Sequence, residues 1–226
     1  MNRISENYKK IELSLIKHAK MSNRDSNSVR LLAVSKKKSI EDILAAASAG
    51  QRDFGENFVQ EAIEKIKKCQ HNLTWHFIGH LQSNKTKLVA ENFQWVHTID
   101  RMKIAQRLSD QRPKNKPKLN ICIEVNINSE SQKSGVEPQD LLELAHNIKD
   151  LPYIRLRGLM CIPSIEVEFE KQKMSFAKLR HLKNELNTLG FNLDTLSMGM
   201  SSDYPAAIYE GATIVRIGTA LFGERK

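Results

Sequence analysis

An alternation of strand-like and helix-like segments runs along the whole chain and limits the folds that the chain can adopt. Short runs rich in Val, Ile, Leu and aromatic residues alternate with segments whose apolar residues recur at helical spacing. The strand-like segments comprise residues 30–35, 52–57, 74–80, 95–100, 120–128, 154–162, 194–199 and 213–219. The helix-like segments comprise residues 39–50, 57–70, 83–92, 101–111, 137–150, 166–190 and 203–211. Eight strands that alternate with helices predict an α/β fold, a closed (β/α)8 barrel of the TIM type.

The two ends of the chain bear on how such a barrel closes. Residues 1–21 form an amphipathic pattern and predict an extra N-terminal helix. Only a few residues follow the eighth strand, so we expect no eighth outer helix, and we expect the N-terminal helix to pack on the barrel over that gap. Residues 1–226 then form a single domain. The alternative is an open, doubly wound sheet, but no Gly-x-Gly-x-x-Gly pattern follows the first strand.

Residue types at the ends of two helical segments agree with these boundaries. Ser39 stands at the N-cap position of its segment, acidic residues follow in the first turn, and Gly50 ends it. Pro138 lies near the first turn of the segment 137–150, where its missing N–H costs no hydrogen bond.

Apolar runs and cysteine usage exclude several classes of protein. No uninterrupted apolar stretch is long enough to cross a membrane. The N-terminus lacks the apolar core and the cleavage site of a secretory signal. Cys69, Cys122 and Cys161 lie far apart, without the spacing of a metal or redox motif. We therefore expect a cytoplasmic protein without a membrane partner.

The chain is basic, with a formal net charge of +9 and a pI near 9.4. Nucleic-acid binding must be considered for such a charge. The lysines are spread along the chain, aromatic residues make up only 6 %, and no recognised nucleic-acid motif is present. For these reasons we expect no nucleic-acid partner. A basic surface is equally consistent with attraction of anionic small molecules.

Lys36 directly follows the first strand and is the first candidate for chemistry. Side chains alternate along a strand, so Leu32, Val34 and Lys36 share one direction. If the first two fill the barrel, Lys36 points into its mouth, where the loops of such barrels form active sites. Lys38 would follow on the same side, and two nearby ammonium groups lower each other's pKa, which favours the neutral amine of Schiff-base chemistry. The alternative is a solvated loop of three lysines.

The last two strands carry a candidate anion site. The segment "LSMGMSSDYPAAI" places glycine and serines, among them Ser201, between a strand and a short helix. Free backbone N–H groups and hydroxyls in such a loop bind anions. Gly218 lets the backbone approach a ligand closely, and Thr219 adds a hydroxyl. Loops after strands seven and eight of these barrels often bind phosphate. Together with Lys36, this predicts a phosphorylated aldehyde as ligand.

Arg216 shares a strand face with Ile214 and Gly218, and an arginine that points into a barrel needs an acceptor. Glu56, Glu124 or a ring nitrogen of a ligand could provide it. A purely structural ion pair is an equal alternative.

Polar residues at two further strand ends complete the candidate site. Asn57 and His80 are expected to line the mouth of the barrel. His76 and His80 share one side of a strand, but no third ligand or His-Glu-x-x-His pattern accompanies them, so we expect no metal site and interpret His76 as a core histidine.

Several longer motifs make the chain resemble a known family. They are "LLAVSK", "AGQRDFGENFVQE", "WHFIGHLQSNK", "VHTID", "EVNI", "KSGV", "RGLMCIP", "SMGMSSDYPAAI" and "GATIVRIGTALFG". With these motifs the chain resembles the pyridoxal phosphate homeostasis protein family, which is similar to the N-terminal barrel of alanine racemase.

This resemblance implies specific roles for the candidate residues. It implies that Lys36 forms a covalent aldimine with pyridoxal 5′-phosphate (PLP), and that Arg216 lies near the pyridine nitrogen. The phosphate would be held by Ser201, Gly218 and Thr219. The remaining pocket residues that it implies are Asn57, His80, Met198 and Met200, with Lys133 as a second PLP contact.

The family has no settled enzymatic reaction, and it implies a carrier or regulator of free PLP whose partners are PLP and PLP-requiring apo-enzymes. Arginine beside the pyridine nitrogen disfavours protonation of the ring and weakens it as an electron sink. Racemases that resemble this barrel take a second acid/base from another domain, which we do not expect here. A PLP-dependent racemase-like enzyme is the alternative function, and a monomer is the expected state.

Overall fold

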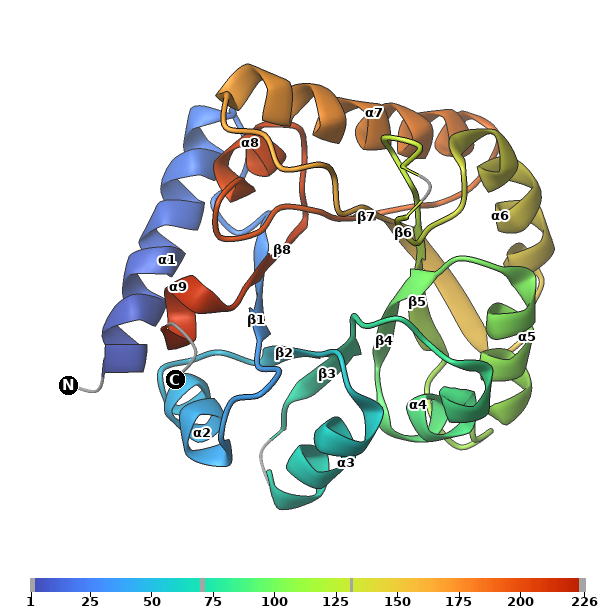
Figure 1. Ribbon diagram of the computed structural model, residues 1–226, viewed down its shortest axis with the longest axis horizontal. Coiled ribbons are helices and arrows are strands. Elements are labelled where there is room, and N and C mark those ends of the chain that lie inside the picture. Colours follow the sequence, from blue (N-terminus) through green and yellow to red (C-terminus); the bar gives the residue numbers. More distant parts are fainter. Residues whose placement is uncertain (1–2, 70–71, 131, 224–226) are drawn as a thin grey trace.

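The computed structural model describes residues 3–69, 72–130 and 132–223, and eight parallel strands within them close into a barrel (Figure 1). The strands are β1 (Arg30–Val34), β2 (Asp53–Glu56), β3 (Thr74–Phe77), β4 (Trp95–Ile99), β5 (Leu119–Glu124), β6 (Ile154–Met160), β7 (Thr195–Ser197) and β8 (Ile214–Ile217). Each pairs with its neighbours in chain order, and β8 pairs with β1. The closed ring confirms the predicted barrel and excludes an open, doubly wound sheet.

Helices cover the outside of the ring (Figure 1). They are α1 (Arg3–Met21), α2 (Ile40–Ser48), α3 (Val59–Lys68), α4 (Thr86–Asn92), α5 (Met102–Gln111), α6 (Leu141–Lys149), α7 (Phe169–Thr188), α8 (Tyr204–Tyr209) and α9 (Thr219–Phe222), with the 3-10 turns η1 (Ser83–Lys85) and η2 (Pro138–Asp140). Every predicted helical segment contains a helix. Residues 1–2 and Gln70, which two of those segments included, lie outside the described residues.

The predicted start of α2 is confirmed in detail. The backbone N–H of Asp42 donates to Ser39 Oγ at 3.2 Å, and the Asp42 carboxylate accepts from the Ser39 backbone N–H at 3.4 Å. These reciprocal bonds form a capping box, which satisfies two backbone donors that a helix start leaves without partners. The helix that follows Lys36 therefore begins at a defined residue.

Helix α1 covers the seam between β1 and β8, where it lies beside α2, α8 and α9 (Figure 1). Its buried face consists of Ile4, Ile11, Leu15 and Ala19. Asn7 Nδ2 donates to the carbonyl oxygen of Leu221 at 3.0 Å, which joins α1 to α9. The sequence predicted no helix after the eighth strand, so α9 is a correction. Because α9 has only four residues, α1 still supplies the cover that was expected.

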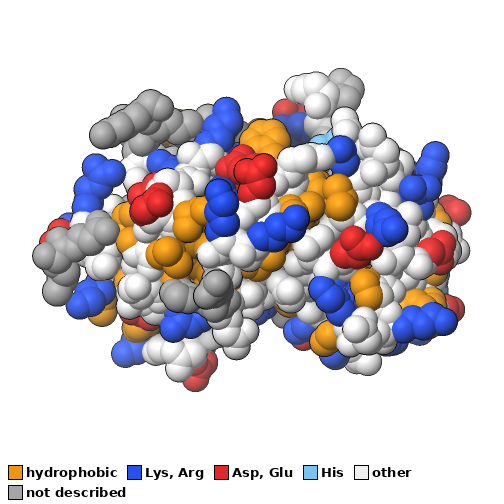
Figure 2. Space-filling view, turned by 90° about the horizontal axis from the view of Figure 1, so that it is seen from below, with side chains coloured by type: hydrophobic (Ala, Val, Ile, Leu, Met, Phe, Trp, Pro, Cys, Tyr) orange, Lys and Arg blue, Asp and Glu red, His pale blue; other side chains and the backbone are white. Residues whose placement is uncertain are grey.

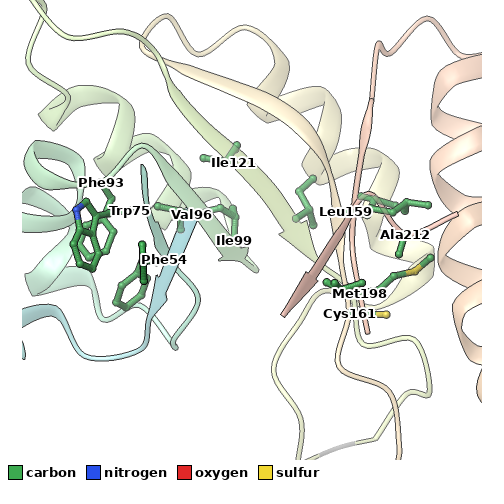
Figure 3. Packing of buried hydrophobic residues seen from close by; sticks show 14 of the residues in the cluster. Phe54, Trp75, Phe93, Val96, Ile99, Ile121, Leu159, Cys161, Met198 and Ala212 are labelled. Carbon is green, nitrogen blue, oxygen red and sulfur yellow. The ribbon is translucent and has the colours of Figure 1, made fainter. Parts of the chain in front are cut away.

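Apolar side chains form one large cluster between the strands and the outer helices. Figure 3 shows part of it, with Phe54, Trp75 and Phe93 in one region and Leu159 and Met198 in another. Inside the ring the filling differs. A small separate cluster of Trp95, Cys122 and Met160 lies there, and polar side chains such as His76, His97 and Arg216 occupy much of the rest.

Every predicted strand runs past the observed one at its C-terminal end, by one to four residues. The segment 74–80 ends as a strand at Phe77, 120–128 at Glu124 and 154–162 at Met160. Apolar residues continue past these points, but the ladder to the neighbouring strand does not, so the chain turns away into loops. These loops stand at the end of the barrel where a candidate site was expected.

The outer surface carries mixed charge. On the face seen in Figure 2, Lys and Arg side chains are interspersed with Asp and Glu and do not gather into one patch. In the described part of the chain, no helix is long and apolar enough to cross a membrane.

Candidate functional site

A cavity of about 340 Å³ opens at the C-terminal ends of the strands. This volume lies in the range of small-molecule sites. Its walls come from the ends of β1, β2, β3, β6, β7 and β8, so residues far apart in the chain share it. The lining residues are Val34, Lys36, Asn57, Ile78, Ile162, Met200, Ser201, Ser202, Arg216, Gly218 and Thr219.

Lys36 lines this cavity together with Val34, as the alternation along β1 predicts. The residue lies two positions beyond the strand, in a turn that precedes α2. Lys38 takes a different direction, because its Nζ donates to the carbonyl oxygen of Gly223 at 3.1 Å. The structure thus directs one lysine of the three-lysine segment to the cavity and another to the C-terminal end of α9.

The loop after β7 forms a polar wall of the cavity. Met200, Ser201 and Ser202 line it, and the Asp203 carboxylate holds the loop by accepting from the Met200 backbone N–H at 2.6 Å. Gly199 adopts a φ of +91°, and a Cβ there would collide with the side chain of Ala207. Glycine is therefore favoured at this turn, which leads into the two serines that line the cavity.

The end of β8, the strand next to β7, supplies the adjoining part of the wall with Gly218 and Thr219. A Cβ at Gly218 would lie 3.3 Å from the backbone oxygen of Val34, tighter than most contacts of this kind. Glycine therefore allows β8 to run close to β1 at the level of Lys36. The predicted anion-binding residues and the predicted amine thus border the same space.

Arg216 is buried, with 5 % of its surface exposed, and its guanidinium is held by neutral groups. One terminal nitrogen donates to the carbonyl oxygen of Ser197 at 2.6 Å and to its Oγ at 2.9 Å. The other donates to the carbonyl oxygen of Cys161 at 2.9 Å. Neither carboxylate considered from the sequence forms a salt bridge with it among the described residues: Glu56 pairs with Lys65, 2.8 Å away, and Glu124 pairs with none.

Glu124 nevertheless lies in the electrostatic field of Arg216. Burial raises the pKa of this carboxyl to about 7, and the positive charge of Arg216 opposes that rise. Burial also lowers the pKa of Arg216 from its ordinary value, although neighbouring acidic groups counteract this effect. The inner end of the cavity therefore contains a guanidinium without a direct ionic partner.

A chain of hydrogen bonds crosses the interior from Arg216 to the opposite end of the barrel. We call Arg216, Ser197, His97, His76 and Asp53 the interior relay. Ser197 Oγ lies 2.8 Å from His97 Nδ1, His97 Nε2 lies 2.9 Å from His76 Nδ1, and His76 Nε2 lies 2.9 Å from Asp53 Oδ1. Burial lowers the pKa of both histidines, that of His97 well below its ordinary value.

The relay has one consistent set of donors when both rings are neutral. Arg216 donates to Ser197, whose hydroxyl then donates to His97 Nδ1. His97 Nε2–H donates to His76, and His76 Nε2–H donates to the Asp53 carboxylate. Every bond has the same donor-to-acceptor direction, so each donor in the relay has an acceptor. The relay orients Ser197 and thereby one partner of Arg216.

Asn57 and His80 occupy two adjoining cavities. Asn57 lines the cavity of Lys36, and its Oδ1 atom is buried without a hydrogen-bond partner. His80 instead lines a neighbouring cavity of about 350 Å³, with Gln82 and Lys85, which Asn57 also borders. A buried acceptor without a partner is uncommon, and a ligand with a donor group would satisfy it.

Two residues that the resemblance placed in the pocket lie elsewhere. Met198 is fully buried in the apolar cluster outside the strands, because β7 turns the neighbouring Ser197 inward. Lys133 pairs with Glu130 at 2.5 Å in the loop after β5 and does not line the cavity.

His76 lies in the barrel interior as the core histidine that we expected, 1 % exposed, whereas His80 is exposed. Across the residues the structure describes, no three His, Cys, Asp or Glu side chains gather as possible metal ligands.

The sequence interpretation missed His97, Ser197 and Asp203. The signal for His97 was present, because a histidine in the middle of an apolar strand needs a partner for each ring nitrogen. Which partner it finds depends on the stagger of the barrel strands, which the sequence does not reveal.

A further cavity of about 280 Å³ lies at the other end of the barrel, between α1 and the starts of β1 and β2. Arg30 and Asp53 are among its lining residues. The interior relay thus extends from one cavity to the other. In barrels of this type the N-terminal face of the strands serves stability and the C-terminal face serves chemistry.

Comparison with known proteins places this geometry among relatives. The family described as "Alanine racemase, N-terminal domain" matches residues 11–226. A pyridoxal phosphate homeostasis protein of Pseudomonas aeruginosa is 54% identical over 226 residues, which cover 100% of this chain and 97% of the relative. The protein of the same name from Escherichia coli is 48% identical over 229 residues and covers 100% and 98%.

Solved structures give the same picture. PipY of Synechococcus elongatus with PLP bound has a TM-score of 0.81 and 37% identity over 92% of this chain and 100% of its own. Alanine racemase of Clostridium difficile has a TM-score of 0.76 at 16% identity, over 97% of this chain and 57% of its own, a likeness of fold.

Proposed function

This chain belongs to the pyridoxal phosphate homeostasis protein family, and we propose that it binds PLP reversibly through Lys36 and acts as a carrier or regulator of free PLP in the cytoplasm. The observation that carries the proposal is the cavity in which an amine, two loops with hydroxyl groups and a buried guanidinium converge. When bound, PLP supplies an aldehyde that a primary amine attacks with release of water to form a Schiff base.

The residues present fit this cofactor. Lys36 would hold the aldehyde carbon, and Ser201, Gly218 and Thr219 would hold the phosphate from the two adjoining loops after β7 and β8. The unpartnered Oδ1 of Asn57 would accept a hydrogen bond from a ligand hydroxyl. These groups border one space of about 340 Å³. His80, in the adjoining cavity, and Met198, in the outer core, have no place in this proposal.

Arg216 favours retention of PLP over catalytic turnover of a substrate. A guanidinium can only donate, so a ring nitrogen beside it stays unprotonated and withdraws electrons weakly. Racemisation also needs acid/base groups on both faces of the substrate. Among the described residues that line the cavity, Lys36 and Arg216 are the only ionisable side chains. We therefore propose retention of the cofactor without a dedicated reaction, and transfer to PLP-requiring apo-enzymes.

The first experiment is a visible spectrum of the purified protein with added PLP, followed by borohydride reduction and peptide mass analysis. We expect a yellow protein and a reduced phosphopyridoxyl group on Lys36. Lys36→Ala should abolish the adduct, and Lys38→Ala, which changes the neighbouring lysine outside the cavity, should leave it. A protein that remains colourless and gains no adduct would contradict the proposal.

A second experiment tests the two loops that we propose bind the phosphate. Ser201→Ala combined with Thr219→Ala should weaken retention of PLP in dialysis while the Schiff base still forms at high PLP concentration. Retention equal to that of the parent would mean that the phosphate binds elsewhere. Conversion of L-alanine to D-alanine by the PLP-loaded parent, abolished by Lys36→Ala, would favour a racemase instead.

A further inference from the structure

The backbone around Lys36 forms a strained turn. Lys38 N–H donates to the carbonyl oxygen of Ser35 at 3.0 Å, so Lys36 and Lys37 are the central residues of a four-residue turn. Lys37 has a φ of +58°, in the left-handed region that a turn of this kind normally fills with glycine or asparagine. A lysine keeps such a conformation only when surrounding contacts impose it.

Two side chains of α3 supply those contacts, one on each side of Lys36. The Nζ of Lys65 donates to the carbonyl oxygen of Ser35 at 2.7 Å. The Oε1 of Glu61 accepts from the backbone N–H of Lys37 at 2.6 Å. Lys65 and Glu61 also pair with each other at 2.6 Å, one helical turn apart. The peptide groups before and after Lys36 are therefore held by one ion pair.

The ion pair is anchored in the protein interior by Glu56. Lys65 is 5 % exposed and Glu56 is fully buried. The Glu56 carboxylate accepts from Lys65 Nζ at 2.8 Å and from Ser35 Oγ at 2.6 Å. Burial of such charges costs solvation that their attraction only partly recovers, so a buried ion cluster is weak evidence for a role in stability. Positioning of the turn is a role that the geometry supports better.

We propose that Lys65 and Glu61 are positioning residues that hold the Ser35–Lys38 turn in its left-handed form and thereby direct the Lys36 amine into the cavity. This inference rests on the proposed function, in which that amine binds the aldehyde of PLP. Without Glu61 the Lys37 N–H loses its acceptor, and the turn relaxes toward negative φ at Lys37. The peptide plane beside Lys36 then rotates, and the amine reaches the aldehyde in fewer conformations.

Glu61→Ala is the variant of choice. Lys65→Met leaves the buried Glu56 without its ionic partner and can fail to fold, whereas the Glu61 side chain is 29% exposed. Glu61→Gln keeps an oxygen that accepts from Lys37 N–H and serves as the rescue. Glu64→Ala changes an exposed glutamate of the same helix and serves as the matched control.

Two probes separate positioning from general structure. PLP reports on the aldehyde bond, and pyridoxine 5′-phosphate, which has an alcohol in place of the aldehyde, reports on the remaining contacts. We expect Glu61→Ala to weaken PLP binding about tenfold, equivalent to about 1.4 kcal/mol. The affinity for pyridoxine 5′-phosphate should stay within about twofold of the parent. This probe has no aldehyde for the Lys36 amine, and Glu61 does not line the cavity. Glu61→Gln and Glu64→Ala should bind both probes like the parent.

Each outcome decides the matter. Equal PLP affinity in Glu61→Ala and the parent, or equal losses for both probes, would overturn the positioning role. A parent protein that binds both probes equally and forms no adduct on Lys36 would instead overturn the proposed function.

Discussion

Replacement of Glu124 by glutamine tests the electrostatics of the barrel interior. Burial raises the pKa of this carboxyl to about 7 from its ordinary 4.5, against the attraction of Arg216. Below pH 4.5 the group is protonated in the folded and unfolded states alike, and its contribution to stability is complete. As the pH rises to about 7, the unfolded chain releases the proton before the folded protein does, so the free energy of unfolding falls.

The magnitude follows from the difference between the two pKa values. Each pKa unit corresponds to about 1.4 kcal/mol, so the parent should lose about 3 kcal/mol relative to Glu124→Gln between pH 4.5 and pH 7. Little of this is screened by solvent, because Glu124 is 7% exposed. Glutamine resembles the protonated carboxyl in shape, so the two proteins should be similarly stable at low pH.

Urea unfolding at about pH 5 and pH 8, followed by fluorescence of the buried Trp75 and Trp95, measures the effect. We expect Glu124→Gln to be the more stable protein at the higher pH. Glu143→Gln on the exposed face of α6 is the control for a lost surface charge. If Glu124→Gln is less stable than the parent at the higher pH, the carboxylate is ionised and paired with Arg216, and the reasoning from burial is refuted.

Three further predictions concern other parts of the barrel. Nitrogen-15 NMR at neutral pH should show His76 and His97 as neutral Nε2–H tautomers. An Nδ1–H signal from either ring would contradict the donor order. Gly158→Ala would place a methyl group against the backbone of Thr195, so we expect loss of folding or a destabilisation above about 4 kcal/mol in chemical denaturation. Gly190→Ala, which has open space around it, should cost only about 1–2 kcal/mol in the same assay. Leu15→Ala should cost about 2–5 kcal/mol by opening a cavity under α1, and a change below 1 kcal/mol would show that α1 adds little to the seam.

The fold could be predicted because its signal is repeated. Eight strands and the helices between them each leave their own periodic pattern, so an error at one boundary does not alter the architecture. Strand ends were the weak point. Apolar residues continue after Phe77, but the paired register with β4 ends at Phe77 and Val96. That is a property of the sheet, which no local pattern contains.

The candidate site was predictable where alternation along one strand decided the direction of a side chain. Lys36 and Arg216 face the cavity for this reason. Met198 could not be placed in this way, because β7 has only three residues and the phase of its alternation depends on pairing with β6. The burial of Lys65 could not be predicted from the sequence either, because lysines on amphipathic helices are usually exposed. Its burial follows from the three acceptors that the fold brings to it.

The pairing of β1 with β8 ties the candidate site to the completion of folding. Lys36 and Thr219 lie far apart in the sequence, and they meet only when the first and last strands of the barrel pair. The loop entropy of that step grows slowly with length, but the contact cannot form during synthesis until β8 has been made. A molecule that contacts both Lys36 and Thr219 binds the closed ring and not the open one. By mass action it stabilises closure by about 2.7 kcal/mol at a hundredfold excess over its Kd.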